Sequence, residues 1–167
     1  MKSIRIALVS LFAIFFATAA LAQSNSQAAF EKLKSLQGSW AGKTSEGREV
    51  QVSFRVVSGG SAVMSEIQGE SEINMITMFH LDGDRLLMTH YCGAGNQPRM
   101  VGTMSPDGKT LTFNFLDVTN LLSTQPGHMQ QLIVTIVDPN HHTEQWDFLN
   151  QDGKQQHHET FDVRRTK

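Results

Sequence analysis

The feature that most constrains the fold is a series of short alternating segments, separated by turn residues, that follows residue 38. Apolar residues occupy every second position in several of these segments, as at Val50, Val52, Phe54 and Val56. This period of two is typical of β-strands with one buried face. Asp-Gly pairs, which favour tight hairpin turns, stand at 82–83, 107–108 and 152–153. The pattern predicts about ten antiparallel strands in an up-and-down meander, and closure into a barrel removes the exposed edges.

A short helix is predicted ahead of the first strand. Phe30, Leu33 and Leu36 share one face of residues 28–38, and Gly38 provides a stop signal. One later connection, residues 117–130, is longer than a hairpin loop and contains Pro126-Gly127. A connection of this length either contributes to function at one end of the barrel or simply carries the chain across that end.

The first 22 residues have the three parts of a secretory signal peptide. Lys2 and Arg5 precede an apolar run, and the run ends in the small-residue site Ala20-Leu21-Ala22. We therefore expect cleavage near Ala22, export to the periplasm or beyond the cell, and no membrane span in the mature protein. The remaining chain, residues 23–167, has the length of one domain.

Charge and cysteine content argue against a nucleic-acid partner and against a disulfide within the chain. The whole chain has a net charge of −2, and the loss of Lys2 and Arg5 makes the mature domain more acidic. Because binding to a phosphate backbone requires a dense basic surface, we expect no nucleic-acid partner. The single cysteine, Cys92, cannot form a disulfide within the chain, so the fold depends on packing for its stability.

The motif Gly38-Ser39-Trp40, directly after the predicted helix, resembles the G-x-W signature of the calycins, the superfamily of lipocalins and fatty-acid-binding proteins. The resemblance implies a calycin-like barrel in which a basic residue on the last strand packs across the tryptophan. Phe161 and Val163 point inward together on the last predicted strand, and the same parity selects Arg165 for this role. Two segments in the middle of the chain, residues 54–67 and 79–92, also resemble exported bacterial calycin-like proteins of no assigned function.

Residues 38–44, together with a histidine pair near the chain end, are distantly similar to the nitrobindins, ten-stranded barrels in which a histidine near the C-terminus binds haem iron. This resemblance implies His158 or His157 as the haem ligand. The glycine pattern of the nitrobindins stops after Gly42, and His158 has the opposite parity to the inward residues of its strand. His157 has the inward parity but lies close to the turn at 152–153. Haem therefore stays an alternative ligand.

Cys92 follows His90 by two places in a strand-like segment. The hairpin before this segment decides which side chains meet, because a slip of one residue moves every side chain to the other face. A two-residue loop at 82–83 puts Met88, His90 and Cys92 on the face opposite His80. A three-residue loop with a bulge puts all four side chains on one face.

Two interpretations of these side chains remain open. Imidazole, thiol and thioether groups on an inner face would suit copper or haem iron, with His90 and Cys92 as candidate metal ligands. Alternatively, His90 is a hydrogen-bonded polar residue and Cys92 a small buried one. Nucleophilic catalysis by Cys92 would need an activating base, and neither an oxyanion-hole motif nor G-x-S-x-G accompanies it. An enzyme is therefore the least favoured class.

Two further candidates lie near the predicted rim of the barrel. Arg99 follows the glycine-containing loop 93–98, where its guanidinium would either hold a ligand carboxylate or be solvated. His128 lies in the long connection and approaches the same end of an up-and-down barrel as that loop.

The sequence thus predicts a single-domain, exported, non-enzymatic barrel that binds a small and mostly apolar molecule in its interior. Candidate ligand contacts are His80, Met88, His90, Cys92, Arg99 and His128. Two alternatives remain. One is a haem or transition-metal protein that uses His90, Cys92, His157 or His158. The other is a structural or interaction protein whose barrel is filled by its large inward side chains.

Overall fold

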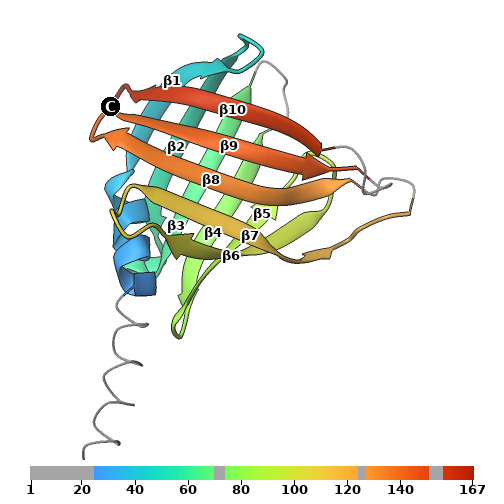
Figure 1. Cartoon of the computed structure of the whole chain (residues 1–167), viewed down its shortest axis with the longest axis horizontal. Coiled ribbons are helices and arrows are strands. Elements are labelled where there is room, and N and C mark those ends of the chain that lie inside the picture. The colour runs from blue at the N-terminus through green and yellow to red at the C-terminus, as the bar shows by residue number, and fades with distance from the viewer. Residues whose placement is uncertain (1–24, 70–73, 124–126, 151–155) are drawn as a thin grey trace, which may run out of the picture.

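The structure is a computed structural model, and it describes residues 25–69, 74–123, 127–150 and 156–167. Ten antiparallel strands form one closed barrel, in which consecutive strands are neighbours and the last strand pairs with the first (Figure 1). The predicted ten-stranded, up-and-down barrel is confirmed. The strands are β1 (Gly38–Thr44), β2 (Glu49–Val57), β3 (Ala62–Gly69), β4 (Met75–Asp82), β5 (Arg85–Tyr91), β6 (Gln97–Met104), β7 (Thr110–Thr119), β8 (His128–Asp138), β9 (His141–Leu149) and β10 (Gln156–Arg165).

Alternation along each strand sends one set of side chains into the barrel. In β2, Val50, Val52 and Phe54 are buried, whereas Gln51 between them is exposed. Each fully buried side chain of this kind stabilises the fold by about 1.5–3 kcal/mol. The same core contains Trp40, Val63, Ile67, Phe79, Leu86, Met88, Met100, Leu111, Phe113, Leu132, Val134, Trp146, Phe161 and Val163.

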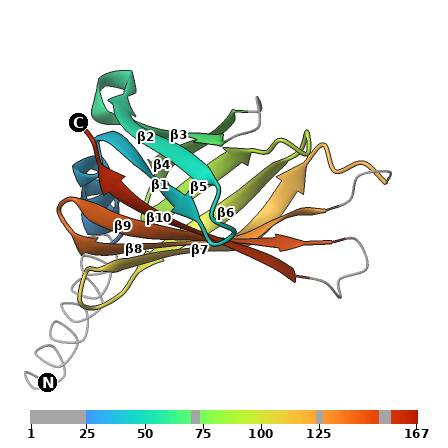
Figure 2. The same ribbon diagram turned by 90° about the horizontal axis from the view of Figure 1, so that it is seen from above.

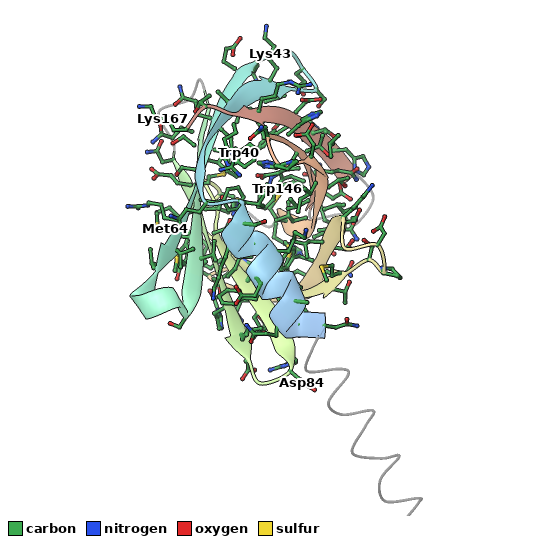
Figure 3. All side chains as sticks on the ribbon, turned by 90° about the vertical axis from the view of Figure 1, so that its left-hand side faces the viewer. Trp40, Lys43, Met64, Asp84, Trp146 and Lys167 are labelled. Atoms are coloured by element: carbon green, nitrogen blue, oxygen red, sulfur yellow. The ribbon has the colours of Figure 1, made fainter. Side chains whose placement is uncertain are left out.

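The predicted helix is confirmed over residues 25–35, and it covers one end of the barrel (Figures 1 and 3). Its apolar face buries Phe30, Leu33 and Leu36 against the barrel core. Ser26 Oγ donates a hydrogen bond of 2.6 Å to the carbonyl oxygen of Asp84, in the turn between β4 and β5. We call the opposite end the mouth, and it is marked by the turn at 45–48 and the loop at 92–96.

Arg165 packs across Trp40 at the helix end, as the calycin resemblance implies. The guanidinium carbon lies 4.1 Å from the centroid of the Trp40 ring. The C-terminus lies at this same end of the barrel (Figure 2). Gly38 begins β1 with φ +136°, and a Cβ atom there would lie 2.4 Å from the carbonyl oxygen of Lys167. Glycine is therefore required at the first position of the G-x-W motif because both its conformation and its contacts exclude a side chain.

The register of the β4–β5 hairpin differs from both predicted registers. Leu81 pairs with Leu86, so the two-residue loop is Gly83-Asp84 rather than 82–83. Phe79 pairs with Met88 in the same register. Leu81 pairs with residue 86 instead of residue 84, a shift of two residues along β5. Because a shift of two keeps each side chain on its face, Met88 and His90 still lie on the face opposite His80, as predicted for a two-residue loop.

The predicted turn at 107–108 is confirmed. Gly108 has φ +68°, and its N–H donates a 2.9 Å hydrogen bond to the carbonyl oxygen of Ser105. The predicted signal peptide, residues 1–22, and the predicted turn at 152–153 lie outside the described residues. In the described part of the chain, no helix has both the length and the apolar character that a membrane span requires.

Candidate functional site

A row of three polar side chains crosses the inner face of β3, β4 and β5. Ser65 pairs with Thr77, and Thr77 pairs with His90. All three are buried, with exposures of 3%, 1% and 0%. Because polar groups are costly to bury in an apolar core, a row of this kind requires hydrogen-bond partners for each member.

The His90 imidazole is the central feature of this row. Its Nδ1 atom lies 2.8 Å from Thr77 Oγ1. Its Nε2 atom has no hydrogen-bond partner among the described residues. Burial lowers the pKa of His90 from 6.5 to about 4, so the ring is neutral at pH 7. The site therefore presents one neutral imidazole nitrogen, held in orientation from behind by a hydroxyl group, to the barrel interior.

A tryptophan from the far side of the barrel faces this imidazole. The rings of His90 and Trp146 are 4.8 Å apart between centroids, with an interplanar angle of 43°. Figure 3 shows Trp40 and Trp146 close together among the strands, beyond the upper end of the helix as drawn. An apolar group that approaches His90 would therefore also contact the indole of Trp146.

A second buried polar group on β9 was not identified from the sequence. Trp146 Nε1 donates a 3.0 Å hydrogen bond to Glu144 Oε2, and Glu144 Oε1 lies 3.1 Å from His142 Nε2. The His142 ring lies edge-on to Trp40, 4.3 Å away between centroids. A histidine pair directly after Pro139-Asn140 is a pattern typical of a solvated turn. The alternation along this segment could have identified the pair. His142 and Glu144 stand at the same alternate positions as inward Trp146 and Phe148, so their side chains also point inward.

The loop at 92–96 and the start of β8 meet at the mouth. Buried Asn96 donates a 2.8 Å hydrogen bond from Nδ2 to the carbonyl oxygen of Gly127. The ring of Phe148 lies against Gly127, where a Cβ atom would come within 2.3 Å of it. His128 stacks on Phe115 with 4.7 Å between ring centroids. His128 thus lies at the mouth, where its ring contacts Phe115 of β7, and the loop contact is made by the neighbouring Gly127.

Cys92 lies just past the end of β5 and is half-buried. Its backbone N–H donates to the carbonyl oxygen of Asn96 at 3.1 Å. Burial raises the pKa of the Cys92 thiol, so the thiolate that a nucleophile or a metal ligand needs is disfavoured at pH 7.

Two predicted ligand contacts lie on the outer face of the barrel. His80 alternates with inward Phe79 and Leu81 and pairs with Leu87. Arg99 Nε donates a 2.6 Å hydrogen bond to Asp117 Oδ1, and Arg99 Nη2 pairs with Asp117 Oδ2. This bond raises the pKa of Arg99 and lowers the pKa of Asp117. Their positions exclude both His80 and Arg99 from an interior site, whereas Met88 is buried within it.

The two histidines implied as haem ligands do not fit that role. The His158 side chain is 54% exposed, and its Nδ1 lies 2.7 Å from Asp147 Oδ1. The His157 side chain is 58% exposed, with Nε2 3.9 Å from Glu46 Oε1. Neither imidazole reaches the barrel core. Within the described ranges, no three His, Cys, Asp or Glu side chains are grouped so that they could hold a metal ion.

Comparison with known proteins relates the chain to others through its fold. No family model matches the sequence, and no curated protein matches it. A similar solved structure is Rv2717c from M. tuberculosis, with 16% identity, a TM-score of 0.58, and coverage of 83% of this chain and 98% of that one. Another is EF1p2_mFAP2b bound to DFHBI, with 12% identity, a TM-score of 0.39, and coverage of 80% and 95%. The likeness to Rv2717c shows a shared barrel fold.

Proposed function

We propose that this protein binds a small, mostly apolar molecule inside its barrel and anchors one polar atom of that molecule on His90 Nε2. The observation that carries the proposal is the buried imidazole, which is neutral and held by Thr77 at one nitrogen, with its other nitrogen unpartnered. Buried polar atoms in proteins almost always have a hydrogen-bond partner. A ligand atom at Nε2 would supply that partner.

The architecture supports an interior ligand. A barrel of eight strands is just wide enough to be filled by its own side chains, and ten strands enclose more space. The buried side chains around His90 are largely apolar: the Trp146 ring lies 4.8 Å away between centroids, and Met88, two residues earlier on β5, pairs with Met100. Methionine adapts its shape to an apolar partner more readily than branched side chains do. Catalysis through Cys92 is not part of the proposal, because burial raises the pKa of its thiol.

We also propose that the protein is exported, on the basis of the signal-peptide pattern in residues 1–22. N-terminal sequencing of the protein recovered from the periplasm or the culture medium tests this. A mature N-terminus close to Gln23 is expected, and an intact Met1 on a cell-associated chain contradicts it.

Ligand binding is tested by displacement of a fluorescent, uncharged apolar dye, Nile red, from the purified protein by 1-decanol. A His90→Leu variant removes the polar anchor and keeps an apolar side chain of moderate size. One lost hydrogen bond is worth about 0.5–1.5 kcal/mol, so the affinity for decanol should fall about twofold to tenfold. The matched control is His80→Leu, since His80 lies one strand away on the outer face, and its affinity should equal that of the unmodified protein.

The competing functions give different results in the same assay. A dye that does not bind, with no small molecule released on denaturation for mass spectrometry, indicates a filled barrel and contradicts the proposal. If added hemin produces a Soret band and decanol fails to displace the dye, the ligand is haem and the proposal of an apolar ligand is wrong. Equal affinities of the His90→Leu and His80→Leu variants would remove His90 from the site.

A further inference from the structure

Asn96 has a buried side-chain oxygen without a hydrogen-bond partner. The residue stands directly before β6 and is 1% exposed. Its Nδ2 atom donates a 2.8 Å hydrogen bond to the carbonyl oxygen of Gly127. Its Oδ1 atom has no partner among the described residues. Because buried polar atoms almost always have a partner, this oxygen is a second observation, independent of His90, that points to a bound molecule.

The contact with Gly127 fixes the orientation of the Asn96 amide group. The oxygen and the nitrogen of an amide are nearly identical in shape, so the hydrogen bonds decide which is which. A backbone carbonyl oxygen only accepts hydrogen bonds. The amide atom that faces Gly127 is therefore the nitrogen, and the atom without a partner is the oxygen. Only a hydrogen-bond donor can satisfy that oxygen.

Asn96 is a cross-strand neighbour of the segment that carries His90. In the β5–β6 register, Thr89 pairs with Arg99. The backbone N–H of Cys92 donates to the carbonyl oxygen of Asn96 at 3.1 Å, so the same register continues past the end of β5. Asn96 thus stands opposite Cys92, two residues beyond His90.

The side chains of Asn96 and His90 share the inner face. Pro98 and Met100, at the next alternate positions after Asn96, are buried, whereas Arg99 between them is exposed. Diagonal neighbours on one face of an antiparallel pair have Cβ atoms about 7–8 Å apart. Asn96 Oδ1 and His90 Nε2 are therefore close enough for one small polar group to contact both.

Hydroxyl groups fit both atoms. Thr77 can donate to His90 Nδ1 or accept from it, so Nε2 is a donor in one tautomer and an acceptor in the other. A hydroxyl group satisfies Nε2 in either case, and a second hydroxyl can donate to Asn96 Oδ1. Each such bond is about 2.8 Å long, so two hydroxyls on adjacent carbons can bridge side chains at this spacing. An ether or ester oxygen only accepts and would leave Oδ1 unsatisfied.

We propose that Asn96 Oδ1 is a second ligand anchor beside His90, so that the barrel selects apolar chains that end in a 1,2-diol. This inference rests on the proposed ligand-binding function and specifies its ligand class. One hydroxyl of the diol binds His90 Nε2, and the other donates to Asn96 Oδ1. The same chain with an ether in place of the second hydroxyl is disfavoured.

The test compares three compounds of one chain length, 1-decanol, 1,2-decanediol and 2-methoxy-1-decanol, each displacing Nile red at pH 7. The methoxy compound keeps the second oxygen but cannot donate from it. The unmodified protein should bind the diol about twofold to tenfold more tightly than the methoxy compound, although the diol is the more polar of the two. Decanol is the reference for the first hydroxyl alone.

Asn96→Ala and Asn120→Gly are matched variants. Asn120 Nδ2 donates a 2.7 Å hydrogen bond to the carbonyl oxygen of Gly95, so both changes remove a side-chain bond to the backbone at the mouth. Glycine tolerates the φ of +54° at position 120. The affinity for the diol relative to decanol should fall about twofold to tenfold in Asn96→Ala and stay unchanged in Asn120→Gly. Because each protein is tested with the same two compounds, their different hydration cancels.

The outcomes separate this inference from the function on which it rests. A methoxy compound that binds the unmodified protein as tightly as the diol overturns the second anchor and leaves ligand binding intact. An unchanged ratio of diol to decanol affinity in a folded Asn96→Ala variant overturns it as well. Failure of all three compounds to displace the dye overturns both proposals. If Asn96→Ala does not fold, the comparison of diol and methoxy compound on the unmodified protein still decides whether the site requires a donor.

Discussion

The guanidinium group of Arg165 lies over the Trp40 ring, with its carbon 4.1 Å from the ring centroid, and donates from Nη1 to the carbonyl oxygen of Gln37 at 2.6 Å. Trp40 Nε1 in turn donates to the carbonyl oxygen of Leu36 at 2.8 Å. Two side chains from opposite ends of the sequence thus bind the carbonyl groups at the end of the helix. The carbonyl groups in the last turn of a helix have no partner within the helix, and cations stabilise this end through the helix dipole.

Arg165→Ala should lower the free energy of unfolding by about 2–4 kcal/mol. It removes three hydrogen bonds to carbonyl groups and the cation–π contact with Trp40, of which the contact alone is worth about 0.5–2 kcal/mol. Urea denaturation measures the change. Arg164→Ala is the matched control, since the neighbouring guanidinium is exposed, and it should stay within about 0.5 kcal/mol of the unmodified protein. Equal losses would mean that Arg165 does not tie the helix to the barrel.

Gly38→Ala should destabilise the fold more than Gly47→Ala. Both glycines have positive φ, +136° and +81°, and strain of this kind costs about 1–3 kcal/mol. At Gly38 the added Cβ would also lie 2.7 Å from Arg165 Nη1, whereas at Gly47 nothing lies within 4 Å. Thermal and urea unfolding of the two variants separate backbone strain from the steric conflict. A smaller loss at Gly38 than at Gly47 would contradict the contact argument.

Acidification should destabilise the protein through His90. The pKa of His90 is about 4 in the folded protein and 6.5 for an ordinary histidine in the unfolded chain. As the pH falls, the unfolded chain therefore binds the proton first. Stability is therefore complete above pH 6.5 and declines between pH 6.5 and 4, by about 3 kcal/mol in total. Urea midpoints measured across this range should fall less steeply for His90→Leu than for the His80→Leu control. Parallel curves for the two variants would show that burial does not hold His90 neutral.

Thr77→Val should weaken both stability and ligand binding. The substitution keeps the shape of the side chain but removes the hydroxyl that faces His90 Nδ1, which leaves a buried polar atom unsatisfied at a cost of about 1–3 kcal/mol. Thr89→Val makes the same change on the opposite face of β5 and should have little effect. Urea denaturation and the dye-displacement assay test the two consequences separately. Unchanged affinity in the Thr77→Val variant would show that the hydroxyl does not orient the imidazole.

Cys92 should react slowly with iodoacetamide in the folded protein at pH 7. Its raised pKa reduces the population of the thiolate, which is the reactive form. Urea exposes the thiol and should restore the rate of an ordinary cysteine, which provides the control within the same sample. A folded-state rate equal to the unfolded rate would contradict the burial of Cys92.

The barrel itself could be predicted because alternation and turn residues are local signals. Val50, Val52 and Phe54 show the buried face of β2 directly, and the G-x-W motif led by parity to Arg165. The position of the β4–β5 loop at 83–84 could not be predicted from the sequence. Asp82, Gly83 and Asp84 all suit a turn, so composition could not choose which pair forms the loop, and only backbone pairing fixes it.

The candidate site was predicted in part. His90 was found because it stands two places before the single cysteine, on the same strand face as Met88. Glu144 was missed because a carboxylate usually indicates a solvent-exposed position. Its burial depends on Trp146 Nε1 and His142 Nε2, which supply its hydrogen bonds only after β9 has taken its place in the barrel. The contact of Arg99 with Asp117 joins neighbouring strands next to a bulge, and no local pattern specifies that shift in register.

Closure of the barrel has a consequence for the order in which the chain folds. The strand that completes the sheet is β10, and its partner on one side is β1, the first strand to be synthesised. Until the last residues emerge, β1 keeps an unpaired edge that a second nascent chain could occupy. The contact between Trp40 and Arg165 joins the first and last strands of the barrel, so the helix gains its final attachment last. The barrel can therefore close only late in folding. Until β10 pairs with β1, the edge of β1 has to be kept from pairing with another chain.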